Sequence, residues 1–135
     1  MDELIIDLAL YDKIEEAITE AERLANIKID FYTIEDTENT DLINLGTQRL
    51  YELLEDKVSR DTQGIVVFCM SPKLKQFAII FDKSLKSRIK EKDMSEIKGL
   101  IQDRFKSGNI LLGLEEGFQL IAAYLRKDIH KPIDV

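Results

Sequence analysis

Cysteine, histidine and long apolar runs are scarce in this 135-residue chain, and each scarcity excludes a class of protein. One cysteine excludes a disulfide within the chain, and one cysteine with one histidine cannot supply a four-cysteine or two-cysteine, two-histidine zinc site. No stretch approaches the roughly 18 uncharged apolar residues of a membrane-spanning helix. The acidic start Met1-Asp2-Glu3 differs from the basic start of a secretory signal. We therefore expect a cytoplasmic protein without a membrane span.

Side chains for nucleophilic catalysis are also scarce. Cys69 lies in the most apolar segment, where burial keeps a thiol inert, so we predict a core residue. His130 stands in a polar tail beside Pro132, with no partner residue near it in the sequence. A Ser-His-Asp or Cys-His arrangement therefore has no base, and the sequence contains no glycine-rich phosphate loop.

What the chain does contain is a balanced core composition with unevenly placed charge. Its 44% hydrophobic residues and only two prolines predict one folded domain over residues 1–135. Residues 1–62 hold 17 acidic and six basic residues, whereas residues 63–135 hold nine and 13. The net charge of −7 argues against general nucleic-acid binding. The opposite charges of the two halves suggest a weak head-to-tail homo-oligomer.

Apolar periodicity predicts four helices and three strands. In chain order we expect a helix over 10–25, a strand over 27–34, a helix over 42–54, strands over 64–70 and 76–81, and helices over 93–106 and 112–125. Asp7, either Thr40 or Asp41, and Asn109 are the expected helix N-caps, and Gly108 ends the third helix. Residues 4–6 could add a short edge strand.

The order αβαββαα predicts an α/β fold with helices on both faces of a small mixed sheet. The segment 64–70 is apolar throughout, which is typical of a central strand covered on both faces. The connection between the first two strands contains a helix, so we expect those strands to be parallel. The short turn before the third strand predicts an antiparallel hairpin.

Five groups of residues carry a resemblance to a known family. They are 9–25 with the strand that follows, 61–68 (DTQGIVVF), 78–89 (AIIFDKSLKSRI), 101–109 (IQDRFKSGN) and 113–117 (GLEEG). Their order resembles the TPM domain family, which includes thylakoid-lumen photosystem-repair proteins, a modulator of acetylcholine receptors and bacterial envelope proteins. The resemblance spans about residues 9–127, leaving 128–135 as a tail, and it implies an α/β/α sandwich.

The family is also linked to calcium binding and, in plant members, to a proposed acid-phosphatase activity. Asp61 and Asp82 match acidic positions of the family, and the resemblance implies that they could bind Ca²⁺. Lys28 and Asn109 stand where the family has acidic residues. The predicted topology brings Lys28, Asp61 and Asp82 to one end of the sheet. Lys28 could then pair with Asp61 or Asp82 and make the site metal-free, or it could extend into water without a carboxylate partner.

Two polar segments have both a functional and an ordinary interpretation. Lys83, Lys86 and Arg88 could contact an anion or an acidic partner, or they could belong to a solvated linker. The oxygen-rich segment 36–41 could hold a surface cation, or it could be a loop that enters a helix.

The sequence thus favours a non-enzymatic TPM-like interaction module, or a stress or repair accessory module, with an unknown protein partner and no required cofactor. The alternative is a metal-dependent phosphatase that hydrolyses phosphate monoesters and uses Asp61 and Asp82 as ion ligands.

Overall fold

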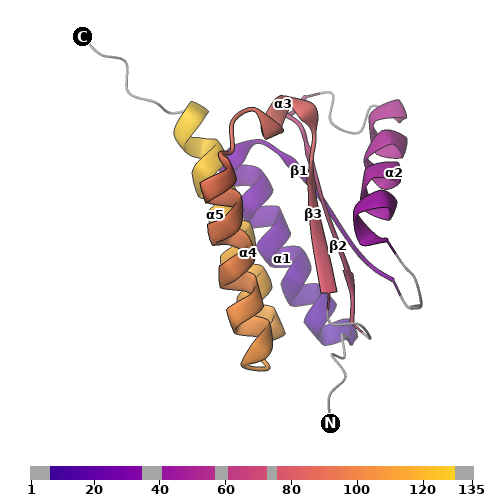
Figure 1. Cartoon of the computed structure of the whole chain (residues 1–135), viewed down its shortest axis with the longest axis vertical. Helices are drawn as coiled ribbons and strands as arrows, with labels where there is room; N and C mark the ends of the chain where they lie inside the picture. Colours follow the sequence, from indigo (N-terminus) through magenta and orange to yellow (C-terminus); the bar gives the residue numbers. More distant parts are fainter. Residues whose placement is uncertain (1–6, 35–40, 57–60, 73–75, 130–135) are drawn as a thin grey trace.

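The computed structural model describes residues 7–34, 41–56, 61–72 and 76–129 (Figure 1). Its elements are α1 (Leu8–Ala25), β1 (Lys28–Thr33), α2 (Leu42–Glu55), β2 (Ile65–Ser71), β3 (Gln76–Phe81), α3 (Lys83–Lys86), α4 (Glu91–Lys106) and α5 (Ile110–Ile129). The predicted order αβαββαα is confirmed, with the one-turn helix α3 added between β3 and α4. Periodicity cannot reveal a single turn, so the sequence predicted a linker there.

The three strands form one mixed sheet in the order β1-β2-β3. β1 runs parallel to β2, with Lys28 opposite Ile65, and β3 runs antiparallel to β2, with Phe81 opposite Val66. Both predicted pairings are confirmed. The starts of β1 and β2 therefore lie beside the end of β3, and we call this the upper end of the sheet, as it is drawn in Figure 1.

Helices cover both faces of the sheet, as Figure 1 shows. α1, α4 and α5 pack on one face, and α2 alone covers the other. All seven residues of β2 are buried, which confirms the predicted central strand. On the three-helix face, the Phe68 ring stacks on Phe77 at a centroid distance of 5.4 Å and meets Phe118 edge-on at 5.5 Å. This aromatic cluster joins the sheet to α5.

The helix ends use the predicted caps. Asp7 accepts the Leu10 N–H at 2.9 Å, and Asp41, rather than Thr40, accepts the Asn44 N–H at 3.1 Å. Asn109 accepts the Leu112 N–H at 3.2 Å. Gly108 has φ 81°, the left-handed conformation expected after α4.

Apolar periodicity places Leu54 and Leu112 on the buried faces of their helices, and these are two of the positions that differ in the structure. Leu54 is exposed, because α2 contacts the sheet through the row that contains Leu50 and Leu53, and Leu54 lies beside that row. Leu112 is only partly buried, whereas Leu114 is fully buried. α5 packs between α1 and α4, and these two helices determine which of its side chains are buried. The apolar periodicity of α5 alone does not show where its neighbours lie.

Some predictions lie outside the described residues: the edge strand at 4–6, the cation-binding interpretation of 36–40, and the role of His130. Within the described ranges, no helix combines the length and the apolar character that crossing a bilayer requires.

Candidate functional site

Three residues singled out in the sequence lie at the upper end of the sheet. Lys28 begins β1, Asp61 precedes β2 and Asp82 directly follows β3. The parallel and antiparallel registers bring these positions to one end, as the topology predicted. The contacts of each side chain determine which ligands this end of the sheet could bind.

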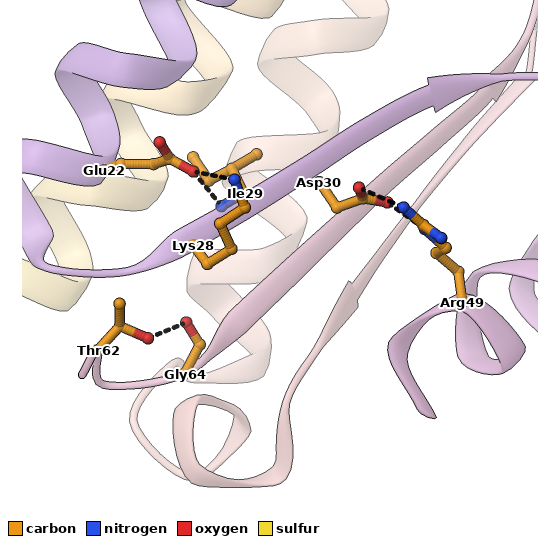
Figure 2. Close-up of polar contacts among 7 residues, drawn as sticks. All are labelled: Glu22, Lys28, Ile29, Asp30, Arg49, Thr62 and Gly64. Carbon is orange, nitrogen blue, oxygen red and sulfur yellow. Dashed lines mark hydrogen bonds and ion pairs between the residues drawn. The ribbon is translucent and has the colours of Figure 1, made fainter. Parts of the chain in front are cut away.

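Lys28 is paired with Glu22, a residue that the sequence analysis missed. Figure 2 shows Glu22 Oε2 facing two nitrogens: the Lys28 ammonium lies 3.6 Å away, and the Ile29 backbone N–H donates to the same oxygen at 2.8 Å. The predicted pairing of Lys28 with Asp61 or Asp82 is therefore wrong, as is the interpretation without a carboxylate partner. The reason is the sharp reversal after α1, where Asn26 adopts a left-handed conformation (φ 53°) and brings the last turn of α1 beside β1.

Asp82 uses both carboxylate oxygens within the fold. Oδ1 accepts the Ser84 N–H at 3.2 Å and so caps α3, and Oδ2 accepts the Ile65 N–H at 3.3 Å. Gly64 allows the close approach of these segments, because a Cβ there would lie 2.7 Å from Ser84 Oγ and 2.8 Å from Leu85 Cγ. Asp82 thus fastens β2 to the turn that follows β3.

The loop before β2 is fastened to the reversal between α1 and β1. The Gln63 side-chain amide donates to the Ala25 carbonyl, and the Gln63 backbone N–H donates to the Asn26 carbonyl at 2.9 Å. The Thr62 hydroxyl donates to the Gly64 carbonyl at 3.3 Å (Figure 2). Asp61 is exposed and makes no hydrogen bond or ion pair with the described residues.

Part of the oxygen set at this end of the sheet is engaged within the fold. Calcium takes six to eight oxygen ligands, whereas the oxygens of Asp82 and Oε2 of Glu22 already accept backbone N–H groups. Asn109 lies at the turn between α4 and α5, at the opposite end of the molecule in Figure 1. Across the described part of the chain, no three His, Cys, Asp or Glu residues are grouped so that they could hold a metal ion. The assignment of Asp61 and Asp82 as metal ligands stays a prediction.

The basic residues after β3 have different surroundings. Lys83 and Lys86 are exposed on α3. Arg88 is partly buried, and its Nη2 donates to the Leu125 carbonyl of α5 at 2.7 Å. A guanidinium near the C-terminal end of a helix also interacts favourably with the helix dipole. Arg88 therefore contributes to the docking of α5, and the contact of Lys83, Lys86 and Arg88 with an anion or a partner stays a prediction.

A second ion pair that the sequence analysis missed connects the opposite face of the sheet to α2. The Arg49 guanidinium of α2 donates to both carboxylate oxygens of Asp30 in β1, at 3.0 and 3.2 Å (Figure 2). This hydrogen bonding raises the pKa of Arg49. No local pattern in the sequence links two residues 19 positions apart; only the packing of α2 across the sheet brings them together.

Cys69 is buried, as predicted, and lies under α2. Its thiol donates to the Leu42 carbonyl at 3.3 Å, and burial raises its pKa. A thiol whose pKa is raised is predominantly protonated near neutral pH, so it is a weak nucleophile.

Comparison with solved structures finds the same fold in the BA42 protein from the psychrophilic bacterium Bizionia argentinensis, whose structure was determined by NMR. The TM-score is 0.73 at 24% sequence identity, covering 94% of this chain and 86% of that one. Curated protein sequences give no match. Among protein families, the TPM domain matches residues 3–124, which is most of the chain and includes all five groups of residues that carry the resemblance. This chain therefore belongs to the TPM domain family.

Proposed function

We propose that this chain is a non-enzymatic interaction module, of the stress or repair accessory kind that its family resemblance suggests. The observation that carries the proposal is the use of the carboxylates at the upper end of the sheet. Asp82 accepts two backbone N–H groups, and Glu22 accepts one more and pairs with Lys28. Side chains engaged in this way stabilise the fold, which supports a structural role for them over a catalytic one.

The chemistry of the remaining side chains supports the same proposal. Nucleophilic catalysis requires a nucleophile with an adjacent base that activates it. Burial raises the pKa of the Cys69 thiol, and its hydrogen bond goes to a backbone carbonyl. The Ser84 hydroxyl donates to the Gln63 carbonyl at 2.9 Å, so it is also engaged within the fold.

A metal-dependent phosphatase is the second candidate, because Asp61 is exposed at the same end of the sheet as Asp82. The test is an assay of the purified protein on a phosphate monoester with Ca²⁺, Mg²⁺ or Mn²⁺. We expect no turnover above that of a buffer control. Turnover that disappears in Asp61→Asn but persists in Asp12→Asn, a matched change at an exposed position of α1, would overturn the proposal.

A further inference from the structure

A row of exposed apolar side chains runs along one side of α2, next to the residues that contact the sheet. Ile43, Tyr51 and Leu54 are 66%, 63% and 38% exposed, and the remaining large exposed hydrophobic residue in the described ranges is Leu8 on α1. Their spacing places them along one side of the helix over about 16 Å. Thr47 lies between them, and its hydroxyl donates to the Ile43 carbonyl at 2.7 Å, so it needs no outside partner. Single exposed apolar residues are common, but an aligned row indicates a binding surface.

The described charged side chains nearest this row are acidic, and Lys57 and Arg60, which follow α2 in the sequence, lie outside the described residues. Asp41, Glu52, Glu55 and Asp56 are exposed on α2 and its caps, and the one cation of the helix, Arg49, is engaged by Asp30. The last turn of α2 carries no basic residue, although the helix dipole is negative there. α4, by contrast, ends with Arg104 and Lys106. Among the described residues the end of α2 is therefore acidic, and a cation supplied from outside would interact favourably with it.

We infer that this row, together with the acidic residues beside it, binds a cationic amphipathic helix of a partner protein. An apolar side of such a helix would cover Ile43, Tyr51 and Leu54, and its Lys or Arg residues would face Glu52 and Glu55. The inference deepens the proposed interaction role and rests on it.

Other occupants fit these charges less well. Two copies meeting through α2 would place like charges together, and nucleic acid or an anionic membrane would be repelled. The exposed lysines of α3 could supply positive charge from a second copy, but α3 has no large exposed apolar residue to cover the row.

The experiment is an NMR titration of the full chain with a synthetic helical peptide of about 18 residues, with leucines on one side and lysines on the other. We expect saturable binding with the largest amide shifts in α2. Tyr51→Ser with Leu54→Ser should weaken binding about tenfold or more, because the apolar contact is lost. Leu8→Ser removes an apolar residue that is even more exposed, at 84%, from the helix layer on the other face of the sheet, and should leave the affinity unchanged.

A matched pair of charge changes tests the electrostatic part. Glu52→Lys with Glu55→Lys should weaken binding about tenfold, whereas Glu15→Lys with Glu16→Lys, at exposed positions of α1, should change it much less. Equal weakening by the two pairs, shifts centred on α1, or equal binding of a peptide with glutamates in place of the lysines would overturn the inference. So would self-association that Tyr51→Ser abolishes, because a second copy would then be the occupant.

Failure of this inference is distinguishable from failure of the proposed function. If the peptide does not bind and no phosphatase turnover is found, only the inference about the α2 surface is overturned. Turnover that depends on Asp61 overturns the non-enzymatic role, whatever the peptide does.

Discussion

Glu22 supports the start of β1 through two contacts, so we expect it to matter more than other surface carboxylates. Glu22→Ala leaves the Ile29 N–H without its acceptor and Lys28 without its partner, and should lower the free energy of unfolding by about 1–2 kcal/mol. The measurement is urea denaturation.

Glu20 on the same helix provides the control for Glu22. It pairs with Arg23, and both side chains are largely exposed. Exposed pairs contribute little to stability, so Glu20→Ala should leave the urea midpoint nearly unchanged. Equal losses in the two variants would show that the contact with the Ile29 N–H does not stabilise β1.

Cys69 should make the stability depend on alkaline pH. Burial raises the pKa of Cys69 in the folded state, so the folded chain keeps a thiol proton that the unfolded chain loses above about pH 8.5. The unfolded state then binds fewer protons, and the free energy of unfolding falls as the pH rises, by up to about 1.4 kcal/mol per pH unit. Urea denaturation of the reduced protein between about pH 7 and pH 9.5 should show this fall. Cys69→Ala should show a shallower slope; an identical slope would contradict the prediction.

The packing of α4 against α5 depends on a glycine. A Cβ at Gly117 would lie 2.6 Å from Ile101 Cδ1, so Gly117→Ala should lower the free energy of unfolding by about 1–3 kcal/mol through overpacking. Adding Ile101→Ala should recover part of that loss relative to the sum of the single changes, which a double-mutant cycle measures.

Gly99 on α4 provides the matched control. A Cβ there would meet no atom within 4 Å, so Gly99→Ala should stabilise the chain by about 0.5–1 kcal/mol through helix propensity. Destabilisation by both alanines would mean that the spacing between α4 and α5 does not explain the need for glycine at Gly117.

At the scale of the whole molecule, charge should produce weak self-association. The acidic first half contributes α1 and α2, and the basic second half includes the exposed Lys83, Lys86 and Lys92. Head-to-tail contact between unlike surfaces should increase the sedimentation coefficient at low salt and vanish at high salt, because screening weakens exposed charge pairs. Tyr51→Ser should leave this association intact, since it does not use the apolar row. Identical sedimentation at low and high salt would exclude it.

The sequence by itself determined the order of the elements and, apart from the one-turn helix α3, their kind and approximate ends. Asp7, Asp41 and Asn109 cap helices in the structure as predicted, because capping depends on a side chain and a backbone N–H three residues apart. The uninterrupted apolar run of β2 predicted its central place, and the same run predicted the burial of Cys69. These features depend on chemistry within a few residues.

Only the tertiary structure decided which side chains meet. Glu22 reaches Lys28 because the chain reverses at Asn26, and Arg49 reaches Asp30 because α2 crosses the sheet. The topology predicted from the sequence correctly placed Asp61 and Asp82 at one end of the sheet. It could not show that Asp82 caps α3. Leu54 is likewise exposed because α2 is the only helix on its face of the sheet in Figure 1, so no neighbouring helix covers it. Amphipathic periodicity gives the direction of the buried face of a helix, but not how wide a strip of that helix its neighbours cover.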